Sequence, residues 1–258
     1  MCGILGFTGQ PREGQWSETY RLLETLFLAS EQRGQDATGF VARTEPYKHR
    51  LAGGTVVDKQ PRAAHDFLAR SVLWRGLRHR RCTTVLGHVR MATHGTPADN
   101  RNNHPIVGHS SLYVVHNGIL SNHRETARQH GLRLSTDVDS ELILRFVEAA
   151  KHPAIGLDTA LRNVEGSMAA VAYDGHRDAL YMVRDAGRPL WLLRLANDKR
   201  WFFASTREIL AEAFEAVLGG DWFGKVELLM PLAANVVHVR TISGGLIGLI
   251  GLPDGKCH

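Results

Sequence analysis

The sequence has no hydrophobic run long enough to cross a bilayer, because a membrane-spanning helix needs about 20 consecutive apolar residues. Its first residues also lack the basic patch followed by an apolar run that is typical of a secretory signal. From these absences we expect neither an integral membrane protein nor a protein with a signal peptide. We therefore expect a soluble, cytoplasmic protein.

Cysteine is scarce and widely spaced. Cys2, Cys82 and Cys257 fit neither a disulfide framework nor a CxxC metal site. The 14 histidines show no HExxH spacing, so we expect no metal ion and no cofactor.

Patterns of RNA-binding, zinc-finger and helix-turn-helix modules are missing too. We therefore interpret the arginine-rich stretch 70–82 as a solvated surface and not as a nucleic-acid site.

What is present is an ordinary globular composition, with 43% hydrophobic and 22% charged residues in 258 positions. No linker or repeat divides the chain, which predicts one domain over residues 1–258. Several predicted strands are apolar on both faces, so we expect two covered sheets with helices outside. Helices are predicted over 17–30 with Ser17 as cap, over 61–70 with Pro61 as first residue, and over 139–150 and 206–217. Strands are predicted over 2–9, 39–44, 53–58, 83–90, 111–120, 167–174, 178–185, 189–195, 200–205 and 234–240.

Four groups of polar residues lie near the ends of predicted strands. They are Cys2; Arg90, Thr93 and His94; Asn117 and Gly118; and Asp137 and Asp139. Removal of Met1 would give Cys2 a free α-amine, whose pKa of about 7.7–8.0 suits a base that activates its own thiol. The Asn117 amide and the Gly118 N–H can stabilise an oxyanion. Arg90 suits a carboxylate, and Asp139 suits an ammonium group.

Taken singly, each of these residues has a simpler interpretation. Cys2 resembles a small buried hydrophobe, and Arg90 can pair with a surface acid. Asn117-Gly118 is a common hairpin turn, and Asp139 suits a helix cap. Local patterns alone leave these alternatives open.

Taken together, the order and wording of six segments match one known family. The segments are "MCGILGF" (1–7), "EQRGQDATGF" (31–40), "GHVRMATHG" (87–95), "NNHP" (102–105), "VVHNGIL" (114–120) and "STDVDSELI" (135–143). Together they resemble the class II glutamine amidotransferases, which use an N-terminal nucleophile, and most of all the glutaminase part of glucosamine-6-phosphate synthase. The resemblance covers residues 2–240, and 241–258 form a C-terminal tail.

The resemblance implies a four-layer αββα sandwich of the α+β class and a role for each residue. Cys2 would be the nucleophile, with its α-amine as base, and Asn117 and Gly118 would form the oxyanion hole. The substrate-binding residues would be Arg90, Thr93, His94 and Asp139. The motif that contains Arg33, Gly34, Asp36 and Gly39 would be mainly architectural.

Two departures from the family qualify this expectation. Met91 occupies the position at which the synthase has a tryptophan, so the lid over glutamine would be built differently. The sequence also shows no isomerase, phosphoribosyltransferase or synthetase region.

These features predict a stand-alone glutaminase that converts L-glutamine to L-glutamate and ammonia through a Cys2 thioester, with a separate synthase subunit as partner. One alternative is a γ-glutamyl amide hydrolase that acts on a larger metabolic intermediate. Another is a non-catalytic binding subunit. The apolar tail 244–255 suits either a contact surface or an edge strand of its own domain.

Overall fold

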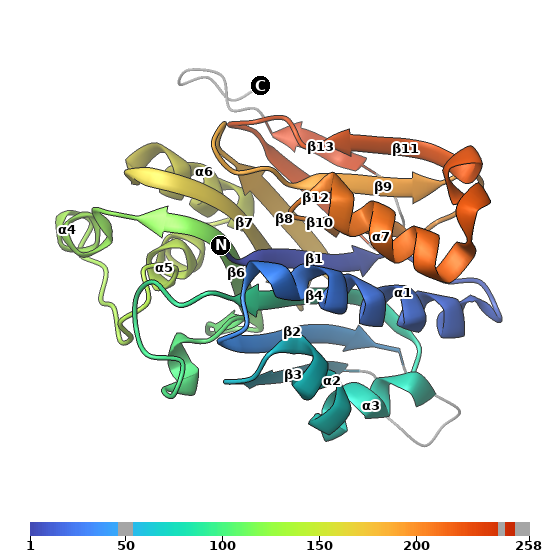
Figure 1. Cartoon of the computed structure of the whole chain (residues 1–258). Coiled ribbons are helices and arrows are strands. Elements are labelled where there is room, and N and C mark those ends of the chain that lie inside the picture. Colours follow the sequence, from blue (N-terminus) through green and yellow to red (C-terminus); the bar gives the residue numbers. More distant parts are fainter. Residues whose placement is uncertain (46–53, 242–245, 251–258) are drawn as a thin grey trace.

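The fold consists of two antiparallel sheets that pack face to face between helices (Figure 1). It is described by a computed structural model that covers residues 1–45, 54–241 and 246–250. The first sheet contains, in spatial order, β11 (Val226–Pro231), β9 (Trp191–Leu195), β10 (Trp201–Ala204), β1 (Gly3–Thr8), β4 (Cys82–Arg90), β2 (Ala37–Thr44) and β3 (Gly54–Gln60). The second contains β13 (Leu246–Ile250), β12 (Val237–Thr241), β8 (Ala179–Arg184), β7 (Gly166–Asp174), β6 (Leu112–Leu120) and β5 (Ile106–Val107).

Helices cover the outer face of each sheet. The first sheet carries α1 (Gln15–Ser30), α2 (Ala64–Arg70), α3 (Val72–Gly76) and α7 (Arg207–Leu218), and the second carries α4 (His123–Gln129), α5 (Glu141–Ala149) and α6 (Pro153–Asn163). Short 3₁₀ turns are η1 (Glu31–Arg33), η2 (Leu77–His79), η3 (Asn100–Asn102) and η4 (Gly220–Lys225). The predicted αββα sandwich of the α+β class is confirmed. No helix in the described ranges is both long and apolar enough to span a membrane.

The core has three apolar layers, which explains why the strands are hydrophobic on both faces. On β1, Phe7 faces the helices while Ile4 faces the second sheet. On β7, Ala170 faces the outer helices while Ala169 and Val171 face the first sheet. Because side chains alternate along a strand, each strand contributes to two layers at once.

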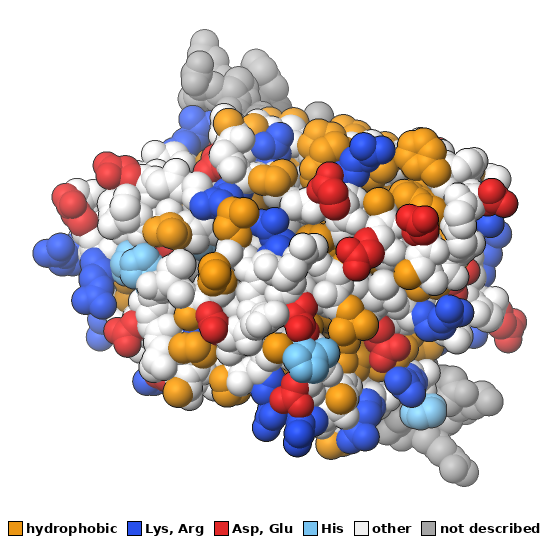
Figure 2. Space-filling model, viewed as in Figure 1, with side chains coloured by type: hydrophobic (Ala, Val, Ile, Leu, Met, Phe, Trp, Pro, Cys, Tyr) orange, Lys and Arg blue, Asp and Glu red, His pale blue; other side chains and the backbone are white. Residues whose placement is uncertain are grey.

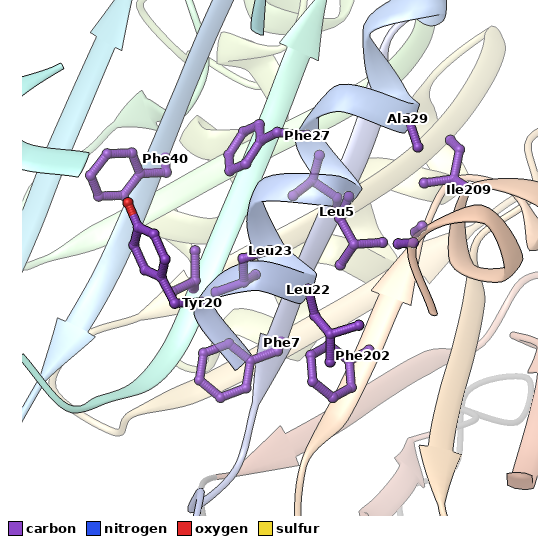
Figure 3. Packing of buried hydrophobic residues seen from close by; sticks show 14 of the residues in the cluster. Leu5, Phe7, Tyr20, Leu22, Leu23, Phe27, Ala29, Phe40, Phe202 and Ile209 are labelled. Atoms are coloured by element: carbon purple, nitrogen blue, oxygen red, sulfur yellow. The ribbon is translucent and has the colours of Figure 1, made fainter. Parts of the chain in front are cut away.

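The helix α1 forms most of its contact with the first sheet through one apolar stripe. Figure 3 shows Leu22, Leu23 and Phe27 of α1 in one cluster with Leu5 and Phe7 of β1, Phe202 of β10 and Phe40 of β2. Phe27 packs directly on the backbone of β4, because a Cβ atom on Gly87 would lie 2.5 Å from its ring. Glycine at that position therefore lets the aromatic ring approach the strand.

Several predicted details of the elements are wrong. The first helix begins at Gln15 after Gly14, which has a φ of 83°, so Ser17 lies inside the first turn and is no cap. The second predicted helix begins at Ala64, and Pro61 lies before it. The strands β5 and β11 and the helices α3, α4 and α6 were not predicted. The predicted edge strand in the tail is confirmed as β13, while residues 242–245 and 251–258, with Cys257, lie outside the described residues.

The surface charges are mixed. Figure 2 shows basic and acidic side chains interspersed with hydrophobic ones on the face that it presents. Within the arginine-rich stretch, Arg70 pairs with Asp66, and Arg78 lies 3.3 Å from Glu24. Neighbouring acids therefore offset part of this positive charge.

Replacing Phe27 with alanine is expected to lower the free energy of unfolding by about 3–5 kcal/mol. The ring is fully buried and lies edge-on to Trp74 at 5.1 Å between centroids, so its loss leaves a cavity under α1. Leu28→Ala on the same helix is the control, because Leu28 is 48% exposed and should change stability by about 0.5 kcal/mol or less. Urea denaturation measures both, and equal midpoints for the two variants would contradict this packing.

Candidate active site

The pairing of β1 with β4 decides where Cys2 lies. Gly3 is opposite Val89 in this antiparallel ladder, so Cys2 lies beside Arg90, the last residue of β4, and Met91 comes next in the chain. The Cys2 Sγ atom is 3.4 Å from both the backbone oxygen and the backbone nitrogen of Met91. Residues 89 positions apart in the sequence thus meet at one end of the first sheet.

The motif 31–40 holds this end of the sheet together. Arg33 Nε donates a hydrogen bond of 2.8 Å to the Cys2 carbonyl oxygen. The Asp36 carboxylate accepts one of 2.7 Å from the Ala92 N–H. A Cβ atom on Gly34 would lie 2.3 Å from the Arg90 carbonyl carbon, so only glycine permits this approach. These contacts agree with the architectural role expected for the motif.

The thiol of Cys2 lies in an environment that keeps it protonated. Burial raises its pKa above the ordinary value, against the lowering effects of the Met91 backbone hydrogen bond, the N-terminal charge and Arg90. The Asp139 carboxylate adds to the raising effect. A thiol with this pKa needs a base beside it to act as a nucleophile near neutral pH.

The guanidinium group of Arg90 is held in place by backbone and amide oxygens. Its Nη1 donates to the Asn103 side-chain oxygen at 2.8 Å, and its Nη2 donates to the carbonyl oxygens of His94 and Gly95. These bonds use three of its five N–H groups, and the other two have no partner among the described residues. The orientation is therefore fixed while part of the fork remains free for an anion.

Asn117 and Gly118 lie inside β6 and not in a turn. The strand continues to Leu120, with Asn117 opposite Ala169 and Gly118 opposite Met168 of β7. The hairpin-turn interpretation is therefore wrong. Gly118 has a φ of 155°, and a Cβ atom there would lie 1.9 Å from the Ser167 carbonyl oxygen.

The side-chain nitrogen of Asn117 is buried without a hydrogen-bond partner among the described residues. Asn117 is only 1% exposed. A buried N–H group without a hydrogen-bond partner lowers the stability of the fold. We therefore expect an acceptor atom of a ligand to bind this nitrogen.

The carboxylate of Asp139 is buried and does not cap α5. It accepts the Leu120 N–H at 2.8 Å, while Ser140 occupies the N-cap position. In the described part of the chain, the one basic side chain within 4 Å of it is His94, whose Nδ1 is 3.9 Å away. This buried carboxylate is therefore suited to pair with a positively charged ligand group.

The remaining residues of the loop differ in their surroundings. The ring of His94 lies 5.2 Å from that of His123, while Thr93 is exposed. The side chain of Met91 is 50% exposed, and its Sδ is 2.8 Å from the Met1 nitrogen. Met91 thus lies at the mouth of the site, at the position where an aromatic lid was expected in relatives.

Some supporting residues were not predicted from the sequence. Ser140 Oγ donates to Asp139 Oδ1 at 3.3 Å and lies 2.9 Å from Nδ1 of His116. Asn103 orients Arg90, and Lys59 contacts the loop that contains Asn103. The motifs "NNHP" and "VVHNG" contain Asn103 and His116, but Lys59 belongs to no motif.

Three buried histidines lie near the site, His88 on β4, His104 in the loop before β5, and His116 on β6. The rings of His88 and His104 stack at 4.1 Å between centroids, and His88 Nε2 is 2.9 Å from the His116 carbonyl oxygen. Burial lowers the pKa of His88 to about 3 and that of His104 well below its ordinary value, and it also lowers the pKa of His116. All three are therefore neutral at physiological pH.

Comparisons with known proteins agree with this geometry. Residues 88–212 match the family described as "Glutamine amidotransferase domain", a range that includes Arg90, Asn117 and Asp139. The chain is 31% identical over 67% of its length to a glutamine–fructose-6-phosphate aminotransferase from Halalkalibacterium halodurans. It is 29% identical over 86% of its length to the enzyme of the same name from Mesorhizobium japonicum. It spans 27% and 35% of these two relatives, about a third of their length.

The fold also resembles solved structures. Glutamine phosphoribosylpyrophosphate amidotransferase from B. subtilis, complexed with ADP and GMP, superposes with a TM-score of 0.66 at 20% identity. The match covers 92% of this chain and 47% of that one. This likeness supports the fold.

Replacing Gly118 with alanine is expected to destabilise the protein by about 2 kcal/mol or more, because the new Cβ would collide with the backbone of β7. Gly76→Ala is the control, since Gly76 has helical dihedral angles and nothing lies within 4 Å of a Cβ built there. That change should alter stability by about 1 kcal/mol or less. Thermal unfolding compares the two, and a stable Gly118→Ala protein would contradict the described contact with Ser167.

Proposed function

Because the chain contains a class II glutamine amidotransferase domain, we propose that it hydrolyses L-glutamine to L-glutamate and ammonia. The single observation that supports this most is the buried, unpartnered side-chain nitrogen of Asn117 on β6, the strand whose Leu120 N–H binds Asp139. Residues 1–258 are proposed to act as one domain, because the middle apolar layer is shared by both sheets.

The proposed substrate lies with its α-carboxylate on the free N–H groups of Arg90 and its α-ammonium group on Asp139. Both partners are held by the backbone, so they change little when glutamine arrives. His94 lies next to Asp139, and Thr93 belongs to the same loop, so both are proposed to border the substrate. The side-chain amide of glutamine would then point toward Cys2 and Asn117.

The proposed reaction begins when Met1 is removed, which frees the Cys2 α-amine. The Met1 residue that must leave is 58% exposed. The amine takes the thiol proton, and the sulfur attacks the amide carbon to form a tetrahedral oxyanion. Asn117 Nδ2 and the Gly118 N–H would donate hydrogen bonds to that oxygen.

The intermediate collapses when the protonated amine gives its proton to the leaving NH₂ group. Ammonia departs, and a γ-glutamyl thioester on Cys2 remains. The same amine then takes a proton from water, whose attack releases glutamate and restores the thiol. Ammonia is mostly protonated at neutral pH, so we propose that a separate synthase subunit accepts it directly.

A second candidate function follows from Met91. Its backbone N–H contacts the thiol, and its side chain is flexible and half-exposed. Such a side chain is proposed to leave more room on the leaving-group side than an aromatic ring. The same residues could then bind a γ-glutamyl amide of a larger metabolic intermediate. Comparing kcat/KM for glutamine with that for a series of γ-glutamyl amines decides between them, since a glutaminase prefers the unsubstituted amide.

Cys2→Ala is expected to reduce glutamine hydrolysis by about 10³-fold or more, because the nucleophile is lost. Cys82→Ala is the matched control, since Cys82 is buried in the core of the first sheet and should retain activity. Intact mass spectrometry after treatment with diazo-oxo-norleucine should show one label and the absence of Met1 in the wild type. Equal, near-zero rates in wild type and Cys2→Ala would instead favour a binding subunit.

Asn117→Ala is expected to lower kcat by about 10²–10³-fold with a small change in KM, because the amide acts on the oxyanion. Gln129→Ala removes an exposed amide from α4 and should change neither constant. Steady-state kinetics provide the test. A variant that loses affinity for glutamine but keeps kcat would place Asn117 in ground-state binding instead.

A further inference from the structure

Lys59 connects the β2–β3 hairpin to the loop that follows the site. Its ammonium group donates to the carbonyl oxygens of Asn103 at 2.7 Å and Pro105 at 3.0 Å. In return, Asn100 Nδ2 donates to the Lys59 carbonyl oxygen at 2.8 Å. Backbone and side chain of one residue therefore both bind the same loop.

The hairpin is shaped to receive this loop. Gly39 of β2 is paired with Lys59 of β3, and a Cβ atom on Gly39 would lie 2.3 Å from the His104 carbonyl oxygen. The loop therefore rests directly on the backbone of β2, and Lys59 closes over it from the next strand. Asn103 is fully buried and His104 is 3% exposed in this arrangement.

From this loop the contacts lead to Arg90. The side-chain oxygen of Asn103 accepts Arg90 Nη1 at 2.8 Å. The nitrogen of the same amide donates to the carbonyl oxygen of Pro97 at 2.8 Å and to Asn100 Oδ1 at 3.0 Å, which fixes the orientation of the amide. A movement of the backbone at Asn103 therefore shifts the guanidinium group.

The charge of Lys59 strengthens this connection. Its ammonium group has no carboxylate within 4 Å among the described residues, and its hydrogen-bond partners are two backbone dipoles. Burial lowers its pKa to about 8, with the Asp99 charge raising it and the Arg90 charge lowering it further. Lys59 is therefore mostly protonated at pH 7, and its two bonds are charge-assisted.

We propose that Lys59 is a positioning residue for glutamine binding, which acts through Asn103 on the orientation of Arg90. The inference rests on the proposed function for the identity of the ligand. The Lys59 ammonium group binds carbonyl oxygens of this loop, so we assign its effect to the loop and not to contact with the substrate.

Lys59→Met removes the charge and keeps a chain of similar length. On a Cys2→Ala background, it is expected to weaken L-glutamine binding about 10-fold in titration calorimetry, equivalent to about 1.4 kcal/mol. In the otherwise unaltered enzyme it should raise KM by a similar factor, with kcat within about twofold. Lys151→Met is the control because Lys151 is exposed, and Lys59→Arg should recover part of the affinity.

Hydrogen exchange of residues 96–105 without glutamine gives a readout independent of turnover. The inference predicts faster exchange of this loop in Lys59→Met than in wild type or Lys151→Met. Unchanged exchange, or unchanged glutamine affinity, overturns the role of Lys59 and leaves the proposed function intact. Wild type that binds glutamine without hydrolysing it overturns the proposed function, while the effect on affinity still decides the role of Lys59.

Discussion

The structure of the site depends on one antiparallel pairing, that of β1 with β4. Its register places the start of the chain against Arg90 and Met91, and a shift by one residue would turn Cys2 to the other face of the sheet. The neighbouring pairing of β2 with β4 and the contacts of Arg33 and Asp36 stabilise the same end. Rigid strands, and not a loop, thus hold the candidate nucleophile.

The polar side chains of the candidate site are held mainly by hydrogen bonds to the backbone. Asp139 is held by a backbone N–H, and Arg90 by backbone oxygens and one amide. Asn117 is the exception, with a buried nitrogen that has no partner among the described residues. Groups fixed before the ligand arrives need little reorganisation, which is the basis of electrostatic preorganisation.

Much of the fold can be predicted from local sequence patterns, whereas the arrangement of the candidate site cannot be predicted from them. The apolar spacing of Leu22, Leu23 and Leu26 predicts α1, although Gly14 and not Ser17 precedes it. The Asn117-Gly118 dipeptide has turn propensity, but pairing with β7 over the whole of β6 overrides it. Motif order identified the residues around the candidate site, whereas Lys59 has no local signal because its partners lie more than 40 positions away.

The three buried histidines near the site make the stability of the fold depend on pH. In the unfolded chain each would take up a proton near pH 6.5, whereas in the fold each has a lowered pKa, His88 to about 3. Below pH 6.5 the unfolded state therefore binds more protons, and stability falls by up to about 1.4 kcal/mol per histidine for each further pH unit. Since folded domains retain only about 5–15 kcal/mol in total, mild acid is expected to destabilise the contact between β4 and β6, where His88 meets the His116 backbone.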